Sequence, residues 1–263
     1  MRTKSWWVRT SLVAALLVGC QSETTLEPTA PPAQIRELPA GWDSGDTGAF
    51  EALIHQPPWT EPLEWSEPAR SVLFETTLED LATPRSAELA VRAALLMALD
   101  KRPSTAPALL ARLERRLPAQ ARGRAAVDIV CARALGRRAE LEPALRGNLR
   151  ALAIGPYPHP ELDVRVECAR AYLEPMDKTL RPIALSARPV LRFLVRVLRA
   201  ETPAERNDPP DWKRVETIAW PKTRAADALV QWLADPAPYT ADASWGDQNR
   251  WAERALHELG LEP

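Results

Sequence analysis

The chain has 263 residues, and 34 lysines and arginines balance 35 aspartates and glutamates to a formal net charge of −1. This balance argues against a protein that binds nucleic acid through its overall charge, although the stretch 112–150 is rich in arginine. Three cysteines are too few for a small fold built on disulfides. The interior must therefore be held together by packing, and the chain is long enough to bury a large core.

The first 19 residues have the layout of an export signal. Three basic residues and no acid occupy the first nine positions, and an apolar run at 11–18 ends on Gly19, just before Cys20. An apolar run of about eight to ten residues is much shorter than the ~20 that a membrane-spanning helix needs. We therefore expect cleavage of this segment rather than a permanent transmembrane helix.

Residues 17–20, Leu-Val-Gly-Cys, resemble the lipobox of bacterial lipoprotein precursors. In that family the cysteine is joined by a thioether to diacylglycerol, and signal peptidase II cuts just before it. The resemblance implies lipidation at Cys20 and a membrane anchor in the cell envelope, outside the cytoplasm. Gln21 in place of aspartate implies the periplasmic face of the outer membrane if the cell is Gram-negative. An ordinary secretory signal or an unprocessed helix is the alternative.

The next segment, 20–65, is rich in proline and is expected to act as a tether between the lipid and the domain. Its later part is less clearly a linker. Residues 50–54 have the composition of a short helix, and Trp59 and Trp65 are costly to leave in water, so this part is a candidate to pack on the core. The helical domain is then expected at 66–263.

From residue 66 onward, signals for helices recur with little strand signal between them. Thr83-Pro84 and Ser104-Thr105-Ala106-Pro107 are typical helix starts, with a capping residue and a proline in or near the first turn. Prolines at 103, 118 and 156 interrupt the pattern. Further helices are expected at 224–235 and 247–260, and we predict eight to ten helices in all.

Three of the expected helices align with one another at 90–99, 126–135 and 163–172, with steps of 36 and 37 residues. The last two copies share Cys-Ala-Arg-Ala at 131–134 and 168–171, and each step leaves room for one additional helix. The copies resemble the HEAT-like repeat family in the opening Asp163-Val164-Arg165 and the close Arg133-Ala134-Leu135-Gly136, although Asp128 replaces the arginine in the middle copy. The resemblance implies an all-α helix-pair array, a HEAT-like α-solenoid, with an irregular helical bundle as the alternative.

The sequence offers no recognisable catalytic machinery. Cys131 and Cys168 lie among small apolar residues and are expected in the core, with a disulfide between them as the alternative. Histidines 55, 159 and 257 show no zinc-binding spacing, and no nucleophile elbow or glycine-rich phosphate loop is present. The many carboxylates are expected on solvated helix faces, paired with arginine. We therefore expect no catalytic residue, metal or cofactor.

The candidate partner surface has two parts. Five tryptophans, at 212, 220, 232, 245 and 251, crowd the C-terminal third, and either form a binding groove or close the end of the array. Trp232 and Trp251 are expected in the core, whereas Trp212 and Trp245 lie near helix starts and are surface candidates. The proline-flanked loop 155–160 adds Tyr157 and His159 as exposed candidates.

The function expected from these features is a lipoprotein, anchored at Cys20, that acts as a scaffold or adaptor for a protein partner in the cell envelope, with no role in binding nucleic acid. One alternative is an α-helical hydrolase or carbohydrate-active enzyme with paired carboxylates, which would need a deep pocket holding two close acids. The other is a purely structural envelope component. A shallow face carrying aromatic and arginine side chains would favour the scaffold.

Overall fold

The computed structural model describes residues 34–42, 63–78, 83–100, 102–115, 124–138, 142–180, 182–199, 212–234 and 236–261. The chain divides into two compact units, 1–31 and 32–263, and all described residues belong to the second. The predicted export signal and Cys20 lie outside the described residues.

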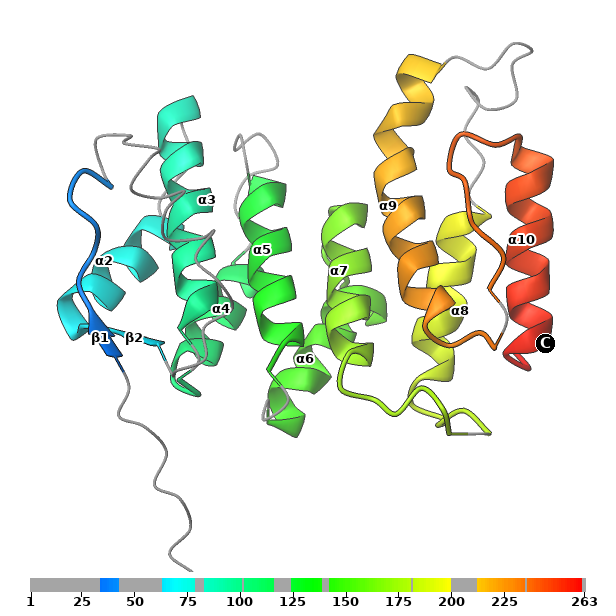
Figure 1. Ribbon diagram of the computed structural model, residues 1–263, viewed down its shortest axis with the longest axis horizontal. Helices are drawn as coiled ribbons and strands as arrows, with labels where there is room; N and C mark the ends of the chain where they lie inside the picture. The colour runs from blue at the N-terminus through cyan, green and yellow to red at the C-terminus, as the bar shows by residue number, and fades with distance from the viewer. Residues whose placement is uncertain are drawn as a thin grey trace, which may run out of the picture. The chain divides into compact units, whose positions relative to one another are not determined.

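The described residues form an all-α fold, as predicted, with nine helices and two three-residue strands (Figure 1). The strands β1 Gln34–Arg36 and β2 Leu63–Trp65 pair in parallel. The helices are α2 Glu67–Leu78, α3 Pro84–Leu99, α4 Thr105–Glu114, α5 Arg124–Gly136, α6 Pro143–Ile154, α7 Leu162–Leu173, α8 Arg188–Leu198, α9 Trp212–Val230 and α10 Trp245–Glu258. None of these helices has both the length and the apolar character to span a bilayer.

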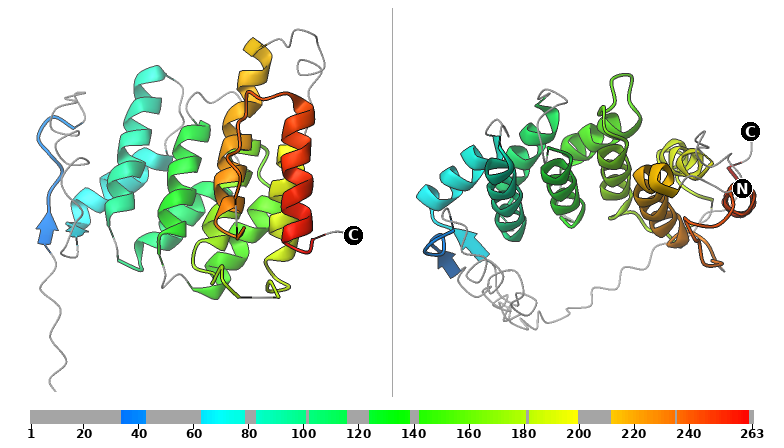
Figure 2. Two further views of the ribbon diagram at one scale, coloured as in Figure 1. Left: turned by 45° about the vertical axis from the view of Figure 1, so that its right-hand side comes forward. Right: turned by 90° about the horizontal axis from the view of Figure 1, so that it is seen from above.

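The helices of this unit lie in two layers, which are clear when it is viewed from above (Figure 2). Helices α3, α5, α7 and α9 contact one another in order along one layer, and α2, α4, α6 and α8 do so along the other. Across the layers α2 packs on α3, α4 on α5, α6 on α7 and α8 on α9, while α10 packs on α8. The three aligned sequence copies lie in α3, α5 and α7, with one helix between successive copies.

Hydrogen bonds from arginines near the ends of helices join residues that are 36 or 37 positions apart, the same step that separates the aligned sequence copies. Arg102 Nη2 donates to the carbonyl of Trp65 at 2.7 Å, and Arg138 Nη1 donates to the carbonyl of Arg102 at 2.9 Å. On the other layer, Arg115 Nη1 donates to the carbonyl of Leu78 at 2.6 Å. Each arginine thereby donates a charge-assisted hydrogen bond to a carbonyl at or near the end of a preceding element.

The helix ends follow the sequence signals in part. Thr83 caps α3, because its Oγ1 accepts the backbone N–H of Ser86 at 3.1 Å. Ser104 precedes α4 as predicted, but it makes no capping bond, and its hydroxyl accepts from Arg70 Nη1 at 2.9 Å instead. Helix α9 begins well before the predicted residue 224 and continues through Pro221, a residue that normally signals a helix break.

Part of the predicted tether belongs to the folded unit. Trp65, at the end of β2, is only 1% exposed, and its indole N–H donates to the carbonyl of Leu96 at 2.9 Å. Leu38 and Trp42 pack against the same core. A hydrogen-bonded indole that is fully buried stabilises the packing of this segment on α3, so residues 34–42 and 63–65 extend the helical unit rather than act as a linker.

Three charged or titratable side chains meet in the core between successive helix pairs. Arg112 of α4 and Asp128 of α5 are fully buried, and Arg112 Nη1 lies 2.9 Å from Asp128 Oδ1. His159, in the loop between α6 and α7, places Nε2 3.2 Å from Asp128 Oδ2. Because His159 Nδ1 accepts the backbone N–H of Glu161 at 3.1 Å, the proton of the neutral ring belongs on Nε2, facing Asp128.

The prediction that His159 is an exposed partner residue is therefore wrong. The side chain is buried, since the loop turns it inward toward Asp128 while the neighbouring Tyr157 faces solvent. Burial without a counter-charge would be costly for Arg112 and Asp128, so each of the two depends on the other.

We predict that Asp128→Ala destabilises the fold by about 3–5 kcal/mol, because it leaves the buried Arg112 guanidinium without its carboxylate. The double variant Arg112→Leu/Asp128→Leu should lose markedly less stability, since it removes both charges. Chemical denaturation followed by circular dichroism measures both, with Arg250→Gln on the exposed face of α10 as the control. If Asp128→Ala were at least as stable as the double variant, the conclusion that Arg112 and Asp128 depend on each other would be contradicted.

Candidate functional site

A polar pocket opens between α5, α7 and α9 and has a volume of about 160 Å³. It is lined by four arginines, two glutamates and three small or neutral residues. These are Arg133, Arg137, Arg170, Arg224, Glu167, Glu174, Gly136, Ala171 and Gln231. Because α5, α7 and α9 are neighbours in one layer (Figure 1), residues distant in sequence share this site, here called the arginine pocket.

Glu167 is the centre of the arginine pocket. Its side chain is 1% exposed, and its Oε1 accepts from Arg133 Nη2 at 3.2 Å, Arg170 Nη1 at 3.1 Å and Arg224 Nε at 2.9 Å. Arg170 Nη1 also donates to Oε2 at 3.1 Å. One carboxylate thus draws three guanidinium groups, one from each helix, to a single point, and these charge-assisted bonds fix their positions.

The pocket carries an excess of positive charge. Its lining contains four arginines and two glutamates, which leaves two positive charges unbalanced. Asp227, which bonds Arg224 Nη1 at 3.2 Å at the margin, reduces this excess to one. Arg137, which is exposed, lines the pocket without an ion pair to any described residue, so donor capacity for an anion is left over.

Trp220 forms an aromatic margin to the arginine cluster. Its side chain is 36% exposed, and the guanidinium carbons of Arg133 and Arg224 lie 5.7 Å and 6.0 Å from its ring centroid. These are cation–π distances. The arrangement presents a flat apolar surface beside positive charge.

The repeated Cys-Ala-Arg-Ala quartet explains how the pocket is built. It places Arg133 and Arg170 at equivalent positions of α5 and α7, so both reach the same side of their layer. The two helices approach closely at Gly136, where an added Cβ would lie 2.6 Å from Cα of Ala171. The glycine is therefore required for the close packing that brings the two arginines together.

The cysteines of the quartet are core residues, as predicted. Cys131 and Cys168 are both fully buried free thiols. Burial, followed by the charge of Asp128, raises the pKa of Cys131 to about 12, and burial likewise raises the pKa of Cys168. Both thiols stay protonated at neutral pH, a state without the reactivity of a catalytic thiolate.

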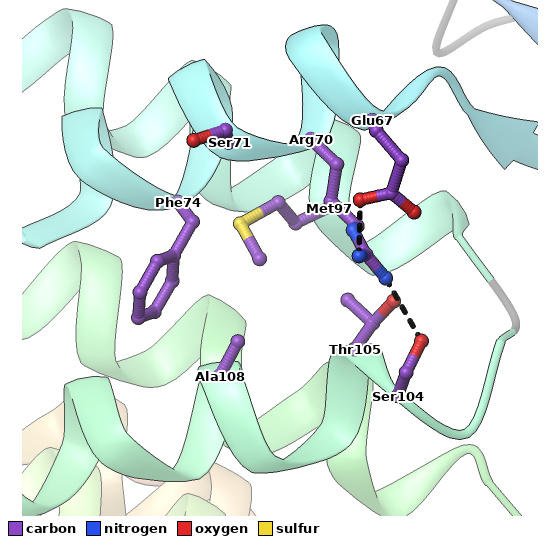
Figure 3. Close-up of a pocket in the computed structure, with 8 residues that line it drawn as sticks. All are labelled: Glu67, Arg70, Ser71, Phe74, Met97, Ser104, Thr105 and Ala108. Atoms are coloured by element: carbon purple, nitrogen blue, oxygen red, sulfur yellow. Dashed lines mark hydrogen bonds and ion pairs between the residues drawn. The ribbon is translucent and has the colours of Figure 1, made fainter.

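A second pocket, of about 310 Å³, lies between α2, α3 and α4 (Figure 3). Phe74, Met97 and Ala108 surround its apolar part, while Arg70 spans from Glu67 to Ser104 on the other side. The arginine here is balanced by one acid and one hydroxyl. The hydroxyl of Thr105, which also lines this pocket, is buried with no hydrogen-bond partner among the described residues, but the lining carries no surplus charge. The arginine pocket, which does carry surplus charge, is therefore the stronger candidate for binding a charged ligand.

The residues predicted for the partner surface do not converge on either pocket. Tyr157 is 78% exposed, Trp245 begins α10 and is half-buried, and no hydrogen bond, ion pair or ring contact joins the two. Trp212 begins α9, and its side chain lies outside the described residues. Trp232 and Trp251 are core residues, as predicted, and the Trp251 indole donates to the carbonyl of Ala237 at 2.9 Å.

Sequence reasoning missed the residues of the arginine pocket. The repeated quartet was a usable signal for Arg133 and Arg170, because a 37-residue period places equivalent residues on neighbouring helices. The expectation that the carboxylates lie on solvated faces is wrong for Glu167, which is buried beneath arginines from α5, α7 and α9. Trp220 and Arg224 come from α9, which is not one of the three aligned copies.

The described residues contain no group of three or more histidine, cysteine or acidic side chains with metal-binding geometry. No protein family, curated protein or solved structure matches the chain. Function has to be argued from the geometry of the site.

We predict that Gly136→Ala destabilises the fold by about 1–3 kcal/mol, because its methyl group would overlap the backbone of Ala171. Gly147→Ala, in α6, is the matched control: nothing lies within 4 Å of the added Cβ, so the better helix former should stabilise the fold by about 0.5–1 kcal/mol. Urea denaturation of both variants checks the two signs. Equal effects at the two positions would show that the α5–α7 approach is not close.

Proposed function

We propose that the protein is a membrane-anchored lipoprotein of the bacterial cell envelope, with a HEAT-like helical array that serves as a scaffold for a protein partner. The anchor rests on the Leu-Val-Gly-Cys motif at 17–20, whose cysteine is placed for lipidation. The array rests on the ordered contacts between successive helix pairs and on the arginine bonds spaced 36 to 37 residues apart.

The observation that carries the scaffold function is the arginine pocket with Trp220 at its margin. Arginine and tryptophan are the residue types that contribute most to protein interfaces, especially where they are held rigidly in place. Here three guanidinium groups are fixed by the buried Glu167, and two of them lie over the indole ring. The surface is thus preorganised for a partner of opposite charge.

We predict that Cys20→Ala abolishes membrane anchoring. Cells expressing the full chain are grown with labelled palmitate and their membranes are fractionated. The unaltered chain should carry the label and stay with the membrane after a high-salt wash, since several acyl chains bind far more strongly than one. The variant should carry no label. Equal labelling and retention of the two chains would overturn the lipoprotein assignment.

We predict that a photocrosslinking residue at Gln231 captures one defined partner in cells. Gln231 is exposed and lines the arginine pocket without carrying its charge, so the replacement leaves all four arginines in place. Leu185, 80% exposed in the segment before α8, is the matched control position.

The expected result is a single adduct, identified by mass spectrometry, that forms at 231 and not at 185, and whose purified partner binds the purified chain. The same adducts at both positions, or none at either, would contradict a scaffold that uses this face.

A further inference from the structure

The geometry points to a specific ligand for the arginine pocket: we infer that it binds a carboxylate group, an aspartate or glutamate side chain within an acidic segment of the partner. This inference rests on the proposed function, because it names the chemistry by which the scaffold recognises its partner. It follows from three features of the pocket, namely the carboxylate that it already holds with donors left over, its size and its aromatic margin.

The first feature is that the pocket already binds a carboxylate. Glu167 shows that guanidinium groups from α5, α7 and α9 converge on one oxygen within 3.2 Å. A guanidinium group has five N–H donors, and these bonds use only part of that capacity. The exposed Arg137 lines the same pocket without an ion pair to any of the described residues, so its donors are available to a ligand.

The second feature is the size of the pocket. A volume of about 160 Å³ corresponds to roughly five water molecules at their volume of about 30 Å³ in the liquid. This space admits the end of an acidic side chain and is too small to enclose a nucleotide. The ligand is therefore a small anionic group on a larger molecule that rests against the rim.

The third feature identifies the larger molecule. Beside the positive charge, Trp220 exposes part of a flat aromatic ring. Aromatic and apolar side chains of a polypeptide pack well on such a ring, and the acids of the same segment complement the arginines. The exposed Glu174 at the rim disfavours densely charged ligands, so scattered carboxylates suit this surface better than a phosphate cluster.

The test measures binding of fluorescein-labelled peptides to the lipidated full-length chain in detergent, by fluorescence anisotropy. The probes are a tetraglutamate, a tetraglutamine and a diphosphoserine peptide with about the same total charge as the tetraglutamate. The tetraglutamate should bind most tightly, with an affinity that falls as salt screens the charges, and the tetraglutamine should not bind.

Three variants locate the binding. Arg133→Gln should weaken tetraglutamate binding about tenfold or more, because it removes a charged hydrogen-bond donor. Arg137→Gln should weaken it about threefold, because that exposed side chain contributes a weaker pair and has no part in the Glu167 cluster. Arg250→Gln, an equal loss of charge on α10, should leave binding unchanged, and circular dichroism confirms that each variant is folded.

Several outcomes would overturn the carboxylate site. These are equal binding of tetraglutamine, tighter binding of the diphosphoserine peptide, or equal weakening by Arg137→Gln and Arg250→Gln. Failure of this site is distinguishable from failure of the scaffold. If the crosslinked adduct forms at position 231 but tetraglutamate does not bind, the carboxylate ligand is overturned and the scaffold function is retained. If tetraglutamate binds in a way that depends on the pocket but no adduct forms, the carboxylate ligand is supported and the scaffold function is overturned.

Discussion

The buried carboxylate of Asp128 is the constraint on which the arrangement of the central helices depends. It faces Arg112 from α4 and His159 from the loop before α7, so one side chain of α5 connects two successive helix pairs. His159 at the same time accepts the backbone N–H of Glu161, the residue that precedes α7. The position of α7 relative to α5 is thereby set through polar contacts in a dry interior, where they are sensitive to geometry. The arginine pocket lies between these same two helices.

Arginine has two different roles in this fold. Arg102, Arg115 and Arg138 bind backbone carbonyls 36 or 37 residues earlier in the chain, at or near the ends of preceding elements, and so act in the stacking of the unit. Arg133 and Arg170 bind a side chain from within the same layer and lie at a pocket. The difference follows from position, since the first group comes at or just after helix ends, where carbonyls lack partners, and the second lies within helices. An arginine-rich composition thus need not indicate a nucleic-acid-binding surface.

The sequence was informative wherever local chemistry decided the structure. The cap at Thr83, the burial of Cys131 and Cys168, and the placement of three aligned copies in α3, α5 and α7 all depend on short-range pattern. It was misleading where tertiary contacts override local preference. His159 sits in a proline-flanked loop that normally faces solvent, and only the distant Asp128 draws it inward.

The same reasoning explains why Asp128 stood out in the sequence only as a departure from the repeat. A charged residue that replaces the arginine of other copies is tolerable in the core only if opposite charges from other elements meet it. Those elements, α4 and the loop before α7, lie on either side of it in the chain, and nothing in their sequence shows that they converge. Departures from a repeat pattern are therefore places where a buried partner should be sought.

The buried Glu167 gives the proposed binding site a physical advantage over exposed arginines. Guanidinium groups repel one another, and long side chains lose conformational entropy when a ligand orders them. In the arginine pocket one internal carboxylate offsets much of the repulsion and holds three of the four side chains before any ligand arrives. It does not neutralise them all, so a net attraction for an anion persists. Because Glu167 leaves the cluster with only a small net positive charge, the pocket favours a ligand group with one negative charge, such as a carboxylate. A group that brings two negative charges to the same point is less well matched.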